Sequence, residues 1–252
     1  MTSYIQLSLN RLLLVIMLFL SAPAHATIEN NIFSMATLEQ VPYGFKTSKG
    51  QIKGRLFDIM NEIINESGLK ASNQLLPSQR LIHELNKGNQ ICTLVANTPY
   101  VSKHFDLIEP IGINLSAGVL SRKEVKLPNY ASLKNLIIAV PLGIYFDKQF
   151  DNDNTLTKIH SLGYSNAIQM LKFKQVDAVA GAIESLLYIA KHSGLAVSDF
   201  APPLILSNLK IYLTCIKDTP NTMREAMRTA IKTLKKKGKI QKIHKQYSSA
   251  QK

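Results

Sequence analysis

The stretch Leu136-Ile137-Ile138-Ala139-Val140-Pro141-Leu142-Gly143 decides the fold class of this chain. An unbroken apolar run that stops at a proline and a glycine is typical of a short strand buried on both faces. A second strand is predicted at Ala178-Val179-Ala180, and residues 183–191 follow it with helical spacing. Buried strands that alternate with amphipathic helices indicate an α/β fold.

The same alternation continues toward both ends of the chain. Apolar residues recur at helical spacing over residues 56–64, and Gly68 is the expected stop. Residues 223–234 give the clearest helical pattern, with Pro220 in its first turn and Gly238 after its end. The other expected elements are a strand before Pro42, helices at residues 81–88, 167–171 and 240–247, and strands at residues 91–95, 113–120 and 210–216.

The first 26 residues have the composition of a secretory signal peptide. Arg11 precedes an apolar run over residues 12–20, and Ala24-His25-Ala26 supplies small residues for cleavage before Thr27. That run spans only about 14 Å as a helix, against about 30 Å for the hydrocarbon core of a bilayer, which argues against a membrane anchor. We therefore expect export to the periplasm and a mature protein that is not embedded in the membrane.

The bulk composition fits a globular protein with a basic surface. Hydrophobic residues make up 46% of the chain and charged residues 19%, and the formal net charge is +13. Many lysines lie between residues 232 and 245, on the predicted C-terminal helices, where a solvated face is the simplest explanation. Export argues against nucleic acid as a partner.

Two cysteines, Cys92 and Cys215, lie in apolar, strand-like stretches. In an oxidising compartment they can form a disulfide, and two separate buried thiols fit the sequence as well, so both alternatives stay open. The histidines and cysteines show no metal-ligand spacing, so we expect no metal and no cofactor.

Several short strings occur in a familiar order along the chain. They are Val41-Pro42-Tyr43-Gly44-Phe45, residues 50–59 with Gly54 and Asp58, Thr98-Pro99, Pro110, Val176-Asp177-Ala178-Val179, and Lys237-Gly238-Lys239-Ile240 followed by Ile243 and Tyr247. In this order they resemble the family 3 extracellular solute-binding proteins, the polar amino-acid-type receptors of ABC transporters. The resemblance covers residues 41–247, nearly the whole predicted mature chain.

This resemblance implies a type II periplasmic-binding-protein fold with two α/β lobes joined by two crossing hinge strands. Lobe 1 would comprise residues 27–113 and 212–252, and lobe 2 residues 114–211. The ligand would lie in the cleft and stabilise a closed form by contacting both lobes. We expect a monomer.

Two departures from the family argue against an amino-acid ligand. In the amino-acid binders an arginine three residues after the threonine of Thr-Pro binds the α-carboxylate, and here that position is Val101. An acid five residues after the aspartate of Val-Asp-Ala-Val binds the α-ammonium, and here that position is Ala182. Without both partners a zwitterion would lose strong charge-assisted hydrogen bonds. Lys103 and Glu184 stay open as nearby substitutes.

Nine residues are candidates for ligand contact. Tyr43 and Phe45 would supply flat apolar area, or simply pack in the core. Asn97, Thr98 and Tyr100 follow a strand where the family presents ligand-binding groups, although a plain turn would look the same. The remaining candidates are Gly143, Ile144 and Tyr145, which resemble a helix start with anion-binding N–H groups, and Arg80, which faces either the cleft or the solvent.

The sequence therefore predicts a periplasmic solute-binding protein, not an enzyme, that captures a small molecule for an ABC-type importer or a membrane sensor. A ligand-free regulatory module is one alternative. A lyase or dehydratase on the same fold is another, with Glu184, Asp106 and His104 as its available acid–base groups. The basic surface favours an anionic ligand, whereas the aromatic pair favours one with a flat or apolar part.

Overall fold

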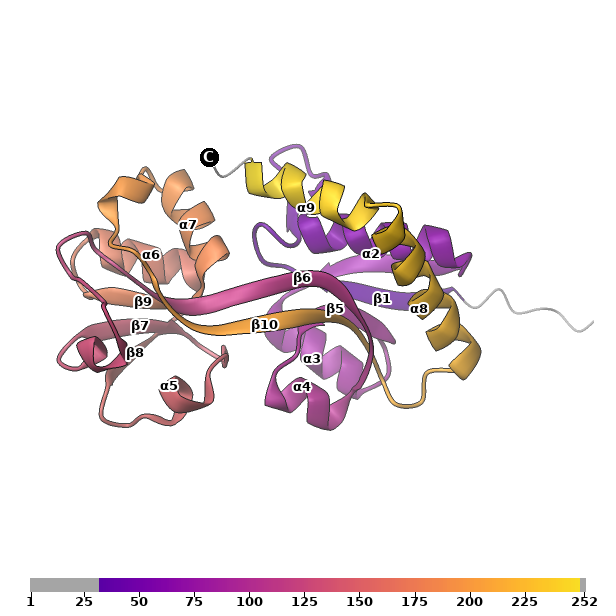
Figure 1. Ribbon diagram of the computed structural model, residues 1–252, viewed down its shortest axis with the longest axis horizontal. Coiled ribbons are helices and arrows are strands. Elements are labelled where there is room, and N and C mark those ends of the chain that lie inside the picture. Colours follow the sequence, from indigo (N-terminus) through magenta and orange to yellow (C-terminus); the bar gives the residue numbers. More distant parts are fainter. Residues whose placement is uncertain (1–31, 250–252) are drawn as a thin grey trace, which may run out of the picture. The chain divides into compact units, whose positions relative to one another are not determined.

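The computed structural model describes residues 32–249, and a six-stranded mixed sheet runs through it (Figure 1). Its strand order is β5-β10-β6-β9-β7-β8. The strands are β5 (Cys92–Ala96), β6 (Asp106–Ser121), β7 (Ile137–Pro141), β8 (Thr157–Ser161), β9 (Ala178–Ala182) and β10 (Leu204–Cys215). Helices pack beside these strands, so the α/β prediction is confirmed.

The long antiparallel strands β6 and β10 join two lobes, as Figure 1 shows. They are the two hinge strands that the family resemblance implied, and both begin earlier than predicted. In β10 the polar pair Ser207-Asn208 separates the apolar residues 204–206 from the apolar stretch that marked residues 210–216, so the prediction began after the pair. The lobe boundaries 113/114 and 211/212 stay a prediction, because both fall inside continuous strands.

The first lobe contains a parallel pair, β1 (Phe33–Leu38) and β4 (Ala71–Leu76), and a short hairpin of β2 (Phe45–Lys46) and β3 (Ile52–Lys53). β4 was not predicted, because three of its six residues are polar and only Leu76 is buried. The helices of this lobe are α2 (Arg55–Ser67), α3 (Ser78–Asn86), α4 (Pro99–His104), α8 (Asn221–Lys236) and α9 (Lys239–Ser249).

The second lobe holds β7, β8 and β9 with their helices (Figure 1). The helical segments are η1 (Tyr130–Leu133), α5 (Lys148–Asn152), α6 (Tyr164–Lys172), α7 (Ile183–His192) and η2 (Val197–Asp199). The predicted helices over residues 167–171 and 183–191 are present. β8 and α5 were not predicted, because their residues are mostly polar and exposed.

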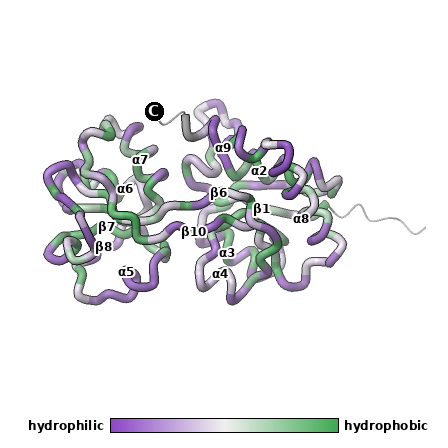
Figure 2. Tube along the Cα trace, viewed as in Figure 1, coloured by the Kyte–Doolittle hydropathy of each residue, from purple (hydrophilic) through white to green (hydrophobic). Residues whose placement is uncertain are grey.

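Helix α2 shows how the sequence pattern forms the core. Ile59, Met60 and Ile63 are completely buried, and the helix packs against α8 and α9. Gly68 ends α2 in the left-handed conformation, with φ 68°, as its position predicted. Figure 2 shows α2 and α7 alternating between hydrophobic and hydrophilic residues, as expected of helices with one buried face.

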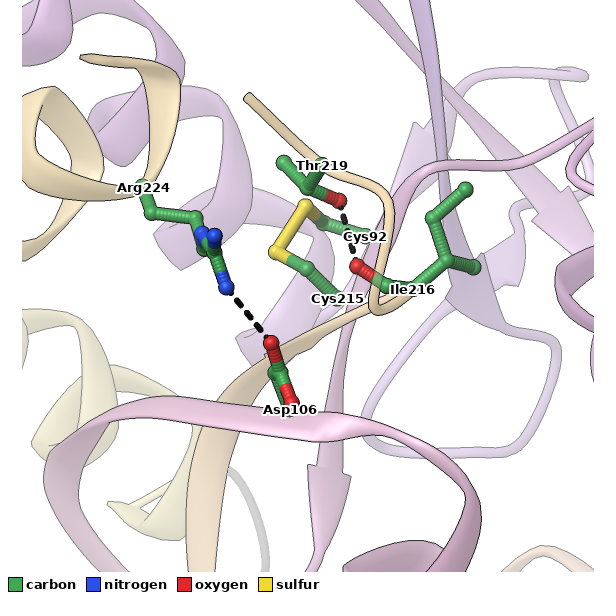
Figure 3. The surroundings of a disulfide bond; sticks show 6 residues. All are labelled: Cys92, Asp106, Cys215, Ile216, Thr219 and Arg224. Atoms are coloured by element: carbon green, nitrogen blue, oxygen red, sulfur yellow. Dashed lines mark hydrogen bonds and ion pairs between the residues drawn. A yellow bond between two sulfur atoms is a disulfide. The ribbon is translucent and has the colours of Figure 1, made fainter. Parts of the chain in front are cut away.

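A disulfide between Cys92 and Cys215 joins β5 to β10 (Figure 3). This resolves the alternative that the sequence left open. Beside it, Arg224 of α8 donates a hydrogen bond of 2.6 Å to Asp106 at the start of β6. The disulfide therefore connects the end of the returning hinge strand to the sheet of the first lobe.

The predicted signal peptide, residues 1–26, lies outside the described residues. Within residues 32–249, none of the helices is both long and apolar enough to cross a bilayer.

Candidate ligand site

A cavity of about 220 Å³ lies between the two lobes, against the hinge strands. The first lobe lines it through the loop after β1, the ends of α2 and α3, and the segment from β5 to α4. The second lobe contributes the turn after β7 and the starts of α6 and α7. The lining residues are Leu38, Gln40, Tyr43, Leu56, Ser78, Ile82, Leu94, Val95, Ala96, Thr98, Tyr100, Val101, Leu115, Ala117, Gly143, Ile144, Tyr145, Phe146, Tyr164, Ala182, Leu209 and Ile211.

Six of the nine sequence candidates come together in this lining. Tyr43, Thr98 and Tyr100 belong to the first lobe, and Gly143, Ile144 and Tyr145 to the second. Their contact with a ligand stays a prediction.

Local structure explains how these side chains reach the cavity. The carbonyl of Tyr43 accepts hydrogen bonds from the N–H groups of Leu56 and Phe57, so the tyrosine is held at the start of α2. The Thr98 hydroxyl caps α4 by accepting a hydrogen bond of 3.3 Å from the N–H of Val101. Its hydroxyl proton remains available for a ligand.

The segment 143–145 forms a turn and not the predicted helix start. Gly143 has φ 76°, a left-handed conformation that favours glycine, and the N–H of Ile144 donates to the Pro141 carbonyl. Helix α5 begins only at Lys148, with Asp147 as its N-cap. The anion-binding helix terminus expected at this position is therefore not present.

Three sequence candidates lie away from the cavity lining. Phe45 packs against Tyr188 of α7, with the ring centroids 6.1 Å apart. The Arg80 side chain is 68% exposed and lies 3.8 Å from Glu84. The backbone N–H of Asn97 donates to the Lys210 carbonyl on β10. Phe45 and Arg80 therefore have the packing and surface roles that the sequence left as alternatives, whereas Asn97 continues the pairing of β5 with β10 between the lining residues Ala96 and Thr98.

The two positions that the family resemblance assigns to the charge partners of amino-acid binders do line the cavity. Val101 and Ala182 are both almost completely buried, on opposite lobes. Lys103 is exposed, and Glu184 forms a hydrogen-bonded ion pair with Arg55. Neither residue is part of the lining.

Glu184 forms an ion pair with Arg55, and this pair crosses between the lobes. Arg55 opens α2 and is completely buried, whereas Glu184 lies in the first turn of α7. Arg55 Nη1 donates to Glu184 Oε1 at 2.7 Å, and Nη2 donates to Oε2, so the pair is bidentate. The guanidinium carbon also lies 5.1 Å from the centroid of the Tyr43 ring, which favours a cation–π contact.

His244 of α9 completes this cluster. Its Nδ1 lies 2.9 Å from Arg55 Nη1 and must act as an acceptor there, because a guanidinium can only donate. Burial and the Arg55 charge lower the pKa of His244, and Glu184 partly opposes them. The imidazole is therefore neutral where it contacts Arg55.

A second contact joins the lobes beside this pair. Ser185 of α7 donates a hydrogen bond of 2.6 Å to the carbonyl of Val41, in the loop before Tyr43.

Burial, with the neighbouring Glu184 carboxylate as a smaller cause, raises the pKa of Tyr43 well above its ordinary value. Tyr43 therefore stays a neutral phenol at the cavity wall.

Tyr164 reaches the cavity because Gly181 leaves room for it. A Cβ at Gly181 would lie only 2.4 Å from a carbon of the Tyr164 ring. The Tyr164 hydroxyl accepts a hydrogen bond of 3.1 Å from the N–H of Ala182. Burial raises the pKa of Tyr164 to about 12, so this ring is also neutral.

The role of Arg55 was not predicted from the sequence, although a signal was present. Residues 50–59 match the family string at Gly54 and Asp58, and Arg55 stands where the family has phenylalanine. A cation in place of an aromatic residue at the start of a buried helix requires an acidic partner. His244 offered no comparable signal.

No group of three or more His, Cys, Asp or Glu residues within the described part of the chain is arranged to hold a metal ion.

The family model for the bacterial extracellular solute-binding proteins, family 3, matches residues 33–250. The chain belongs to this family. No curated protein matches the chain in sequence.

Solved structures share the fold of this solute-binding protein. A histidine kinase sensor domain with similarity to periplasmic binding proteins has a TM-score of 0.73 at 12% identity, over 86% of this chain and 96% of that one. An ancestral arginine-binding protein bound to arginine has a TM-score of 0.71 at 20% identity, over 86% and 97%. The GluR0 ligand-binding core from Nostoc punctiforme, in complex with L-glutamate, has a TM-score of 0.71 at 18% identity, over 85% and 98%. At these identities the likeness shows the two-lobed fold.

Proposed function

We propose that this solute-binding protein captures a small molecule in the interlobe cavity, in the periplasm, and presents it to an ABC-type importer or a membrane sensor. The observation that carries the proposal is the cavity itself, which both lobes and both hinge strands line. A ligand there contacts both lobes at once and so favours the closed form. The protein acts as a monomer, without a cofactor and without nucleic acid.

The ligand is not a standard amino acid. Val101 and Ala182 offer no charge to an α-carboxylate or an α-ammonium, and both lie at the cavity wall. A desolvated zwitterion without ionic partners loses several hydrogen bonds to water and gains none of equal strength.

Binding without catalysis agrees with the positions of the acid–base candidates. Asp106 bonds to Arg224, and His104 stacks on Tyr100 with ring centroids 4.2 Å apart. Glu184 bonds to Arg55. None of these three groups is part of the cavity lining, where an acid or base would have to reach a substrate.

A ligand-free regulatory module is the second candidate function. The Arg55–Glu184 pair supports it, because this contact joins the two lobes directly through protein side chains. In that case the closed form would be a permanent state that a membrane partner recognises.

Native mass spectrometry of the exported protein, followed by a thermal-shift screen of small metabolites, tests the proposal. We expect a compound that copurifies, or one that raises the melting temperature with saturation. Stabilisation by common amino acids would contradict the role given to Val101 and Ala182. Failure of every compound to bind would favour the regulatory module.

A further inference from the structure

The cavity lining has a chemical character that points to one class of ligand, given that the protein binds a ligand there as proposed above. None of the residues that line it is an aspartate, glutamate, lysine, arginine or histidine. Its ionisable side chains are tyrosines, and the two deepest of them, Tyr43 and Tyr164, stay neutral because burial raises their pKa values. The basic surface of the protein therefore does not continue into the cavity.

Most of the lining is apolar, and five aromatic rings contribute to it. Val101, Ala182 and Ile211 form buried parts of the wall. The aromatic residues are Tyr43, Tyr100, Tyr145, Phe146 and Tyr164. Aromatic walls give large contact area and prefer offset or edge-to-face contact with another ring.

The volume limits the size of the ligand. A dry cavity of about 150 Å³ lined by apolar side chains accommodates one benzene molecule. This cavity measures about 220 Å³, so it has room for a single ring with a short substituent.

The polar side chains of the lining are Gln40, Ser78, Thr98 and four tyrosines, and two of these tyrosines are exposed to solvent. Tyr100 and Tyr145 are 44% and 73% exposed, whereas Tyr43 and Tyr164 are buried. The Tyr100 hydroxyl accepts a hydrogen bond of 3.2 Å from Asn86 Nδ2 and keeps its own proton to donate. Thr98 likewise retains its hydroxyl proton, as described above. These donors fit an oxygen acceptor on the ligand near the mouth.

We propose that the ligand is an uncharged, mainly apolar molecule about the size of one substituted aromatic ring, with a hydroxyl or carbonyl oxygen directed toward Thr98 and Tyr100. Its ring occupies the space between Val101 and Ala182, where amino-acid binders of the family place their charged partners. The cavity thereby selects against anions and cations of the same shape, because it offers them no counter-charge.

Three probes of nearly equal shape test this selection: benzyl alcohol, benzoate and benzylamine, the last two charged at pH 7. Isothermal titration calorimetry of the exported protein, supported by saturation-transfer NMR for weak binding, gives the affinities. We expect benzyl alcohol to bind and each charged probe to bind at least about 100-fold more weakly. A factor of 100 in affinity corresponds to about 2.8 kcal/mol, and burying an unpaired charge costs more than that.

Two substitutions at one position locate the binding. Ala182→Leu fills the cavity and should abolish binding of benzyl alcohol. Ala182→Asp places a carboxylate in the wall and should reverse the preference, so that benzylamine binds at least about tenfold better than benzyl alcohol. Ser165→Asp adds the same charge on the exposed surface of α6 and should leave all three affinities unchanged. Circular dichroism checks that each variant is folded.

The outcomes separate the ligand class from the function. Benzoate or benzylamine binding as well as benzyl alcohol, with loss in Ala182→Leu, would overturn the ligand class and leave the binding function intact. The same holds if none of the probes binds and the metabolite screen finds a charged ligand. Absence of binding by the probes and by the whole screen would overturn both.

Discussion

The ion pair between Arg55 and Glu184 gives a prediction whose size follows from its burial. Glu184→Gln removes the carboxylate charge and leaves the guanidinium of Arg55, whose side chain is completely buried, without a counter-charge. Removing one partner of a buried pair typically costs about 3–5 kcal/mol. The Glu184 side chain is 23% exposed, and glutamine keeps one acceptor oxygen, so we expect the lower end of that range, about 3 kcal/mol.

Urea denaturation measures this loss as a lower transition midpoint. Thermal denaturation measures it as a lower melting temperature, and for a chain of this size about 3 kcal/mol corresponds to a fall of about 6–12 °C. Because the pair crosses between the lobes, part of the cost can be avoided by opening, which lets water reach Arg55. Small-angle X-ray scattering should therefore show a larger radius of gyration in Glu184→Gln than in the wild type.

Two further variants serve as controls for the Glu184→Gln variant. Glu66→Gln breaks an exposed pair with Lys237 and should change the free energy of unfolding by at most about 0.5 kcal/mol. Arg55→Leu combined with Glu184→Leu removes both charges and should recover most of the lost stability. If Glu184→Gln is no more destabilising than Glu66→Gln, the pair does not hold the lobes and the argument from burial is wrong.

Three other predictions concern stability. The Cys92–Cys215 disulfide closes a loop with a sequence separation of 123, so its reduction should lower the free energy of unfolding by about 4–5 kcal/mol. Urea titrations with and without a thiol measure this loss, and an unchanged transition midpoint would contradict it. Because the pKa of His244 is lowered in the folded protein, the unfolded chain protonates this imidazole more readily, and the free energy of unfolding should fall as the pH drops below about 6.5. His244→Asn keeps an acceptor for Arg55 and should flatten that pH dependence relative to the wild type. Ile63→Ala, in the completely buried face of α2, should cost about 2–5 kcal/mol by calorimetry, and a value below about 1 kcal/mol would mean that the site collapses around the cavity.

Elements with strong apolar periodicity were predictable because local sequence determines which face they bury. The helices over residues 56–64 and 223–234 and the strand over residues 136–140 all occur close to the predicted places. β4 and β8 were missed for the opposite reason. Half of the residues in β4 and most of those in β8 are polar, and each is a strand because a neighbouring parallel strand, β1 or β7, pairs with its backbone.

The candidate site was predictable where a family string marked it. Tyr43 and Thr98 lie within such strings, Tyr100 directly follows one, and all three line the cavity together with the turn at residues 143–145. Phe45 and Arg80 belong to equally suggestive stretches and lie elsewhere. Alternation along the chain cannot say toward which neighbour a partly buried side chain points.

The sequence by itself determined the family and the two-lobed α/β fold, because both follow from local strings and periodicity. It also predicted that Val101 and Ala182 stand where the amino-acid binders have their charge partners. Only the tertiary structure decided that Cys92 and Cys215 are bonded, that Arg55 pairs with Glu184, and that the cavity between the lobes carries no charged side chain. The physical reason is the same in each case. These contacts join residues more than a hundred positions apart, so they depend on how the lobes and hinge strands pack and not on the neighbours of each residue in the chain.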